Sequence, residues 1–308
     1  MTSQRPHVVD EIHRQPDSWA TALGLAGDLG GVLPRPGERV AVVGCGTSWF
    51  VAIAYAALRE AAGAGETDAF AASGFPDGRR YDRVVVVSRS GTTTEVLRVV
   101  ERTAAPVTVL TAVADSLLAA AVADPVVLAF ADERSVVQTV FATTALMLLR
   151  GSLGTPLDHV VDQARQVLDT GAALPAEVGA AGQFTFLGSG WAYGVALEAG
   201  LKMRESAQLW TEAYPQLEYR HGPISIAQPG RAVWILGRPA PGITDDIAAT
   251  GAALLTGDLD PVADLVRVQS LAVRRALAAG LDPDRPRSLT RSVVLDGVGG
   301  AGSAGGAA

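Results

Sequence analysis

The stretch Val84-Val-Val-Val-Ser88-Arg-Ser-Gly-Thr-Thr-Thr-Glu95 decides how this sequence folds. An unbroken β-branched run predicts a strand buried on both faces, as in a parallel sheet covered by helices. Five hydroxyls and one guanidinium then crowd the loop that opens the next helix. One hydroxyl is enough to cap a helix, so this loop could be a Ser/Thr-rich capping turn. The excess of donors fits a phosphate monoester better, since its three oxygens accept several hydrogen bonds.

A second loop of the same kind, Gly44-Cys-Gly-Thr-Ser48, follows the predicted strand Val40–Val43. Backbone N–H groups at the start of a helix lack intrahelical partners and form the positive end of the helix dipole, so they attract anions. Trp49 stands where a dinucleotide fingerprint needs its third glycine, and a Walker lysine is absent, which disfavours NAD and ATP. Alone, the loop could equally be a tight structural turn. Two such loops after neighbouring strands indicate a ligand site.

Outward from these loops, apolar runs alternate with amphipathic stretches, which predicts an α/β fold. After a Pro/Gly-bearing join at Gly151–Pro156 the pattern restarts, so we expect a first domain at 1–155 with an N-terminal helix, a second domain at 156–296 and a disordered Gly/Ala tail at 297–308. The expected strands are Val40–Val43, Asp68–Ala71, Val84–Val87, Val107–Leu110, Val126–Phe130, Phe184–Leu187 and Ala232–Leu236. The expected helices include Phe50–Ala61, Thr94–Arg102, Ser135–Gly151, His159–Thr170, Tyr193–Ala207 and Pro261–Ala279.

Composition excludes several classes of function. A hydrophobic content of 48% provides a core, and a net charge of −7 without a basic cluster argues against a nucleic-acid surface. The single cysteine, Cys45, excludes an internal disulfide and a thiolate metal cluster, and the scattered histidines indicate no metal site. Neither a spanning apolar run nor a secretion signal is evident, so we expect a cytoplasmic protein without a membrane partner.

A third group of polar residues lies on the predicted helix Tyr193–Ala207. Glu198, Lys202 and Glu205 are spaced i, i+4 and i+7, so they share one helix face. Such a face is usually a solvated salt-bridge ladder. Here its neighbours are Ala, Gly, Leu and Met, and a carboxylate in that setting can serve as a proton-transfer base. Lys202 is the sole lysine of the chain, and His221 precedes a Gly-Pro turn.

Four motifs in this order resemble those of the tandem SIS-domain phosphosugar isomerases: Gly44–Ser48, Ser88–Thr94, Ala196–Glu205 and Arg220–Pro223. The resemblance is to the isomerase half of glucosamine-6-phosphate synthase and to the related sugar-phosphate deaminases. It implies two SIS domains, each a doubly wound, five-stranded parallel sheet flanked by helices. It also implies a homodimer with a composite site, a small-molecule sugar phosphate as ligand and no cofactor or metal.

The resemblance further implies roles for single residues. Glu205 shuttles the proton between C1 and C2 with Glu198 as the next candidate, and His221 of a partner copy assists ring opening. Lys202 is either their counter-ion or an imine-forming nucleophile. Arg89 replaces a glutamine that is common in the synthase. The implied phosphate ligands are Thr47, Ser48, Ser88, Arg89, Ser90 and Thr93, and the implied sugar contacts are Cys45, Gly46, Val136, Val137 and Gln138.

Two departures narrow the expected reaction. We expect no glutaminase domain, and Arg291 stands where the synthase has its imine-forming lysine. Arginine is not deprotonated in proteins and forms no Schiff base, which disfavours transamination. We therefore expect an isomerase/deaminase acting on a 2-amino-2-deoxyhexose 6-phosphate. The alternatives are a dehydratase that eliminates the 3-hydroxyl of glucosamine 6-phosphate or its N-acetyl form, and a non-catalytic sugar-phosphate sensor.

Overall fold

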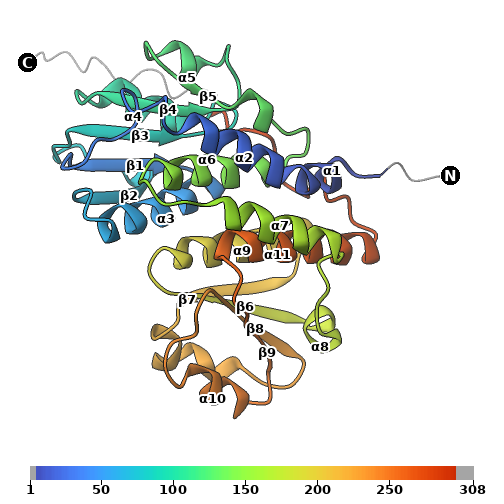
Figure 1. The fold of residues 1–308 in the computed structure, drawn as a ribbon. Coiled ribbons are helices and arrows are strands. Elements are labelled where there is room, and N and C mark those ends of the chain that lie inside the picture. Colours follow the sequence, from blue (N-terminus) through green and yellow to red (C-terminus); the bar gives the residue numbers. More distant parts are fainter. Residues whose placement is uncertain (1–4, 296–308) are drawn as a thin grey trace, which may run out of the picture.

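The computed structural model describes residues 5–295, which form two parallel sheets (Figure 1). The first sheet has the order β2-β1-β3-β4-β5, and all of its pairings are parallel. The predicted α/β class with parallel, helix-flanked sheets is thus confirmed. The strands of this sheet are β1 (Val40–Gly44), β2 (Thr67–Ala71), β3 (Arg83–Val87), β4 (Val107–Thr111) and β5 (Val126–Val127).

The second sheet has four strands within the described residues, one fewer than the resemblance implied. Its order is β7-β6-β8-β9, with β6 (Gln183–Gly188), β7 (Trp210–Pro215), β8 (Arg231–Leu236) and β9 (Ala253–Leu255). The sequence did not predict β7 or β9. Both are edge strands, and β7, with the sequence Trp-Thr-Glu-Ala-Tyr-Pro, carries polar residues because one of its sides has no neighbouring strand.

Helices cover both sheets, and α7, α9 and α11 lie between them (Figure 1). The mutual contacts of α9 with α11 and α3, and of α11 with α7, form this middle layer. The helices are α1 (His7–His13), α2 (Gln15–Leu25), α3 (Thr47–Ala61), α4 (Thr94–Arg102), α5 (Leu117–Ala120), α6 (Val140–Gly151), α7 (Asp158–Asp169), α8 (Ala176–Ala180), α9 (Ala192–Ala207), α10 (Ile243–Ala248) and α11 (Pro261–Ala278).

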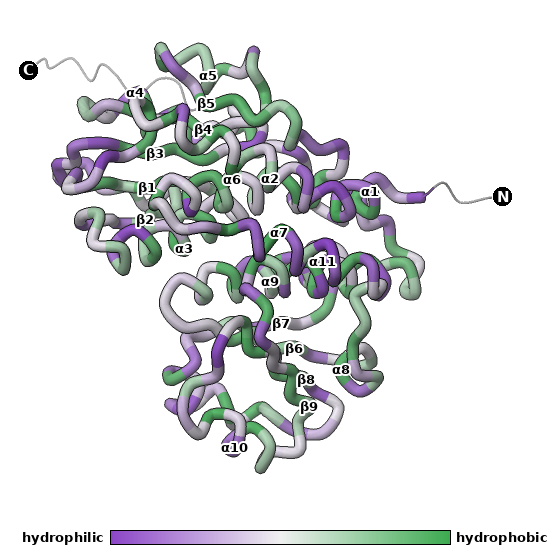
Figure 2. Tube along the Cα trace, in the orientation of Figure 1, coloured by the Kyte–Doolittle hydropathy of each residue, from purple (hydrophilic) through white to green (hydrophobic). Residues whose placement is uncertain are grey.

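The central strands have the hydrophobic character that the valine runs predicted (Figure 2). All four valines of β3 are fully buried, as is the run Val40–Val43 of β1. The largest apolar cluster continues from the first sheet through α6, α7 and α11 to the second sheet. The proposed division at residue 155/156 remains a prediction, since one core serves both sheets. The predicted tail at 297–308 lies outside the described residues.

The two sheets are held together by a close helix crossing and a buried ion pair. A Cβ on Gly194 of α9 would lie 2.6 Å from the carbonyl oxygen of Phe50, so only glycine lets α9 approach α3 this closely. Arg150 of α6 makes a bidentate pair with Asp260, the N-cap of α11, at 3.0 and 2.7 Å. The ring of Trp191 lies 4.4 Å from that guanidinium. These contacts fix α9 against the first sheet.

Three predicted bounds were wrong by three residues or more. Helix α3 begins at Thr47 and not at Phe50, and the strand predicted at Val126–Phe130 ends at Val127, because Ala129–Ala131 form a 3₁₀ turn.

The third wrong bound is a helix start. The sequence predicted a helix from Ser135, but α6 begins at Val140. Glu133 explains the difference, because its carboxylate accepts hydrogen bonds from the backbone N–H groups of Thr139, Val140 and Phe141. This cap fixes the helix start and leaves residues 133–139 as a loop at the carboxyl end of the first sheet. Within residues 5–295, the structure contains no helix of the length and hydropathy needed to span a membrane.

Candidate active site

The two hydroxyl-rich loops lie side by side at the carboxyl edge of the first sheet. They follow β1 and β3, which are adjacent and lie where the strand order reverses. Ligands of open α/β sheets bind in the crevice at this switch point. The N-cap of α3, Gly46, and that of α4, Thr93, make no side-chain cap hydrogen bond. The N–H groups of Ser48 and Trp49 donate to the carbonyls of Cys45 and Gly46 at 3.1 and 3.0 Å, so what the start of α3 offers an anion is chiefly the positive end of the helix dipole.

The C-terminal segment, residues 285–295, lies on the second of these loops. Ser292 Oγ accepts a hydrogen bond from Thr92 Oγ1 at 2.9 Å and lies 3.4 Å from Thr93 Oγ1. The backbone N–H of Thr94 donates to the carbonyl of Val293 at 3.3 Å. The segment therefore contacts Thr93, one of the hydroxyls that the sequence assigned to phosphate, together with its neighbours Thr92 and Thr94. Ser48, Ser88 and Ser90 are each less than 9% exposed.

The carboxylate and ammonium groups of α9 form one buried cluster against the first loop. Lys202 Nζ lies 2.5 Å from Glu205 Oε2 and 3.3 Å from Glu198 Oε1. It also donates to Thr47 Oγ1 at 3.2 Å. The side chains of Glu198 and Lys202 are 6% and 1% exposed, and that of Glu205 is 18% exposed. The predicted shared face is thus a buried cluster and not a solvated ladder.

Burial controls the protonation of this cluster. Desolvation raises the pKa of Glu198 to about 7, although the ammonium of Lys202 opposes the shift. Burial by itself lowers the pKa of Lys202, but the two carboxylates outweigh it and raise the pKa above its ordinary value. Lys202 is therefore a cation held between two carboxylates, as the counter-ion interpretation requires.

Glu205 borders a cavity of about 390 Å³. Its walls include Trp210 at the start of β7 together with Arg287 and Leu289 of the C-terminal segment. The same segment therefore borders the Glu205 cavity at residues 287–289 and meets the phosphate loop at residues 292–295. Lys202 connects Glu205 to Thr47 of the first loop through buried contacts, although the residues that line this cavity do not include that loop.

The predicted sugar contacts differ in how exposed their side chains are. Val136 and Gln138 are partly exposed, and the amide oxygen of Gln138 is buried without a hydrogen-bond partner among residues 5–295. Val137 is 2% exposed, so its side chain belongs to the interior. Cys45 and Gly46 are in the first loop. Desolvation, with a smaller contribution from Glu95, raises the pKa of the Cys45 thiol to about 11, so the thiol stays protonated near neutral pH.

His221 lies apart from these residues. It ends the 3₁₀ turn Glu218–His221, which follows the carboxyl end of β7, and its side chain is exposed. Glu205 lies by the opposite end of that strand, at Trp210. Six residues of extended chain span about 17 Å. Within a single chain, His221 and Glu205 are not brought together.

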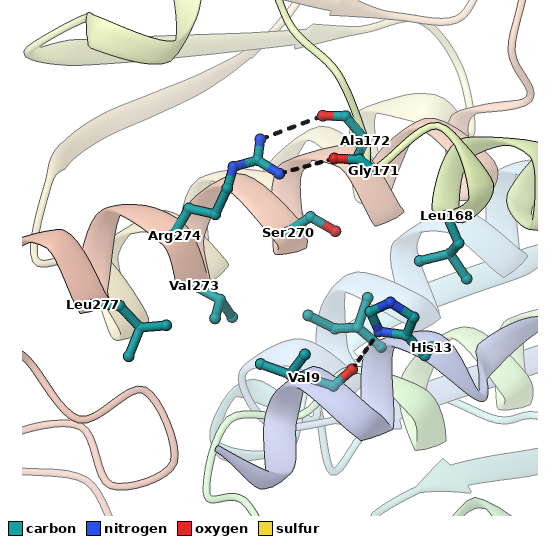
Figure 3. A pocket seen from close by; sticks show the side chains of 10 residues that line it. Val9, His13, Leu168, Gly171, Ala172, Ser270, Val273, Arg274 and Leu277 are labelled. Carbon is teal, nitrogen blue, oxygen red and sulfur yellow. Dashed lines mark hydrogen bonds between the residues drawn. The ribbon is translucent and has the colours of Figure 1, made fainter. Parts of the chain in front are cut away.

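Two other features of the fold resemble ligand sites but contain none of the predicted residues. At the switch point of the second sheet, the Gln216 side chain spans the crevice. Its amide nitrogen donates to the carbonyl of Arg238 at 3.0 Å, and its amide oxygen accepts from the N–H of Ala240 at 2.7 Å. An apolar cavity of about 250 Å³ lies between α1, α7 and α11, with Val9, Leu168 and Val273 among its walls (Figure 3). No group of three His, Cys, Asp or Glu side chains in residues 5–295 is arranged to hold a metal ion.

Sequence reasoning missed the charges that organise the site. Glu11 of α1 accepts hydrogen bonds from the N–H groups of Arg134 and Ser135 at 2.6 and 3.2 Å. Glu133 is fully buried at the start of α6 and pairs with Arg89. An acidic residue ahead of a predicted helix was a usable signal for Glu133. The position of Glu11 on an amphipathic helix gave no such signal.

The fold is that of the SIS phosphosugar isomerases, as the motifs predicted. It is similar to a glucosamine-6-phosphate deaminase from Thermotoga maritima, with a TM-score of 0.80 at 24% identity over 94% of this chain and all of that one. It is also similar to the C-terminal domain of glucosamine-fructose-6-phosphate aminotransferase from Francisella tularensis, with a TM-score of 0.77 at 19% identity over 92% and 99% of the two chains. Identities this low show the fold alone.

Proteins similar in sequence match the chain along nearly its whole length. The chain is 27% identical to glutamine–fructose-6-phosphate aminotransferase (isomerizing) of Methanothermobacter thermautotrophicus over 94% of its own length and 57% of that protein. It thus spans little more than half the length of the curated relatives that it matches. No family model matches the chain. The predicted resemblance to the isomerase half of this aminotransferase is confirmed by a match along nearly the whole chain.

Proposed function

We propose that this protein binds a 2-amino-2-deoxyhexose 6-phosphate and converts it by proton abstraction at C2, as an isomerase/deaminase. The observation that carries the proposal is the contact of Lys202 with both Glu205 and Thr47, at 2.5 and 3.2 Å. It joins a carboxylate at the edge of a cavity to a loop with the features of a phosphate site. The similarity to relatives named as amino-sugar-phosphate enzymes supports the same substrate class.

The proposed reaction uses the groups of this site in turn. The N-termini of α3 and α4 and the hydroxyls of Ser48 and Ser90 hold the phosphate. In the opened sugar, the hydrogen on C2 is acidic because it is α to the carbonyl, and Glu205 removes it. Glu205 returns the proton to C1 of the resulting enolamine, which gives the imine at C2. Water hydrolyses this ketimine to fructose 6-phosphate and ammonia.

Product analysis tests this proposal directly. The protein is incubated with glucosamine 6-phosphate and, separately, with its N-acetyl form, and the products are followed by NMR. We expect fructose 6-phosphate and ammonia from the free amine and no deamination of the acetylated sugar. A product that has lost its 3-hydroxyl would make the protein a dehydratase. Binding without turnover of either sugar would make it a sensor.

The phosphate loop is expected to dominate affinity for the sugar phosphate. Replacing Ser90 and Thr93 together by alanine should weaken binding by about 1–3 kcal/mol for each charge-assisted hydrogen bond that is lost. Binding is measured by calorimetry with the sugar phosphate and with the unphosphorylated sugar. The unphosphorylated sugar should bind poorly to the unmodified protein and be indifferent to the change. An equal loss for both ligands would contradict the phosphate assignment.

Lys202 is expected to act as a counter-ion. An ammonium held between two carboxylates stays protonated, and a protonated amine is not a nucleophile. Borohydride added with substrate should therefore leave the peptide that bears Lys202 without a sugar adduct in the mass spectrum. Lys202→Arg should keep measurable activity, because arginine restores the charge. A trapped adduct, together with an inactive but folded arginine variant, would make the protein a Schiff-base catalyst.

The raised pKa of Glu198 predicts a dependence of stability on pH. The folded state holds this proton up to about pH 7, whereas the unfolded chain releases it near the ordinary value of 4.5. The free energy of unfolding should therefore fall by about 3 kcal/mol as the pH rises from 4.5 to 7, because the unfolded state binds fewer protons in that window. Glu198→Gln should remove this contribution. Urea denaturation at several pH values, with exposed Glu101→Gln as control, measures it, and identical pH profiles for the Glu198 variant and the unmodified protein would refute it.

A further inference from the structure

The guanidinium of Arg89 joins three separate segments of the chain. It donates to the carbonyl of Ser135 at 2.9 Å and to that of Val136 at 3.1 Å. It also donates to the carbonyl of Arg291 in the C-terminal segment at 3.4 Å. The side chain is 1% exposed, and only Nε is without a hydrogen bond among residues 5–295. Both terminal nitrogens are thus already engaged with the protein.

The charge of Arg89 is compensated inside the protein. Glu133 Oε2 lies 3.8 Å from Nη1 of Arg89, and the Glu133 side chain is fully buried. The same carboxylate caps α6 through the N–H groups of Thr139 and Val140 at 2.5 and 2.8 Å. Because an unpaired buried carboxylate is costly, Arg89 stabilises the cap that fixes the start of α6.

Further charges hold the same loop from the opposite side. Glu11 accepts from the N–H groups of Arg134 and Ser135. Arg291 pairs with Asp132 and donates to the carbonyl of Glu133. Residues 132–138, which include three of the five predicted sugar contacts, are therefore tied to α1, to the phosphate loop and to the C-terminal segment at once.

We propose that Arg89 is a positioning residue: it fixes residues 133–138 and the C-terminal segment against the phosphate loop and is not itself a phosphate ligand. The proposal rests on the proposed function, since it assumes that these segments surround the sugar. Its physical basis is the planar fork of arginine, which can serve two carbonyls and a carboxylate together. Lysine, with a compact ammonium, keeps the charge but not this geometry.

Arg89→Lys separates the two roles. For a positioning residue we expect the dissociation constant of inorganic phosphate to stay within about threefold of the unmodified protein, because the charge is kept and the phosphate donors lie elsewhere. Amides of residues 134–141 should exchange with deuterium at least about tenfold faster, because their support is loosened. With the sugar phosphate, kcat should fall at least about tenfold while KM stays within about threefold.

A second variant guards against misfolding. Arg89→Gln leaves Glu133 unpaired, so Arg89→Gln combined with Glu133→Gln removes both charges and should recover the folding that the single change loses. Phosphate affinity should again be retained. Arg83→Gln is the matched control. Arg83 lies at the amino end of β3, the strand that precedes the Arg89 loop, and it pairs with Glu38 at 3.0 Å. It should change neither phosphate affinity nor exchange of residues 134–141.

The outcomes distinguish this inference from the proposed function. A loss of phosphate affinity of about tenfold or more in both Arg89→Lys and the double variant would overturn it, since a charge-assisted bond to the ligand is worth that much. Unchanged exchange of residues 134–141 would overturn it as well. If the unmodified protein turns over no sugar phosphate, the proposed function fails, yet exchange and phosphate binding still report on Arg89.

Discussion

Glu205→Gln is expected to leave the protein folded and able to bind the sugar phosphate while its turnover falls by about 10²–10⁴-fold. Glutamine is nearly isosteric with glutamate but cannot accept a proton, and general-base catalysis commonly contributes that much. The carboxylate is 18% exposed at the edge of the cavity, with Lys202 Nζ 2.5 Å away. It can thus reach a substrate, whereas Glu198, at 6% exposed, lies deeper.

Solvent deuterium exchange at C2 of the bound sugar phosphate is the decisive measurement for Glu205. It reports proton abstraction directly, even where a later step limits the overall rate. Glu101→Gln on the exposed side of α4 serves as the control and should exchange normally. Undiminished exchange in Glu205→Gln would move the base to Glu198, whose pKa of about 7 suits proton transfer near neutral pH.

The parts of the fold that were predictable are those with continuous local signals. The valine runs of β1 and β3 specify fully buried strands, and α4 has the predicted bounds, Thr94–Arg102. Edge strands carry weaker patterns because only part of their surface is buried. For that reason β7, with exposed Trp210, and the three-residue β9 were not predicted. The start of α6 was missed because a side-chain cap, and not the apolar pattern, determines it.

The candidate site likewise has parts that local sequence predicted and parts that it could not. The spacing of Glu198, Lys202 and Glu205 predicted a shared helix face, and the structure places all three in one cluster. The surroundings of Arg89 could not be predicted, because its partners, residues 133–136 and Arg291, are about 45 and 200 positions away in the chain. Contacts of that kind depend on the packing of the whole fold. A loop motif therefore reveals which residues are present but not which of them are already engaged.

His221 and Glu205 are far apart within one chain. The second large expected effect is therefore a recovery of activity when two inactive variants, one at each residue, are co-expressed. If each site combines Glu205 of one chain with His221 of another, Glu205→Gln and His221→Asn should each lose about 10²-fold or more in activity when expressed alone. When they are co-expressed, half of a random set of dimers pairs the two variants, and each such dimer contains one intact site. Activity should therefore recover to about one quarter of the unmodified protein.

This recovery has a geometric basis in β7. The strand separates the Glu205 cavity at Trp210 from the turn Glu218–His221, and buried Tyr219 anchors that turn among Leu187, Val233 and Ile235. His221 of the same chain therefore cannot approach Glu205 without unpacking the second sheet, and the proposed composite site takes it from a second copy. Co-expression of Glu205→Gln with Glu205→Ala is the control and should recover nothing, since no dimer then has an intact base. Light scattering of the purified mixture establishes the dimer. If the mixed dimers form but stay inactive, His221 does not complete the site of the other chain, and ring opening must use a group of the same chain as Glu205.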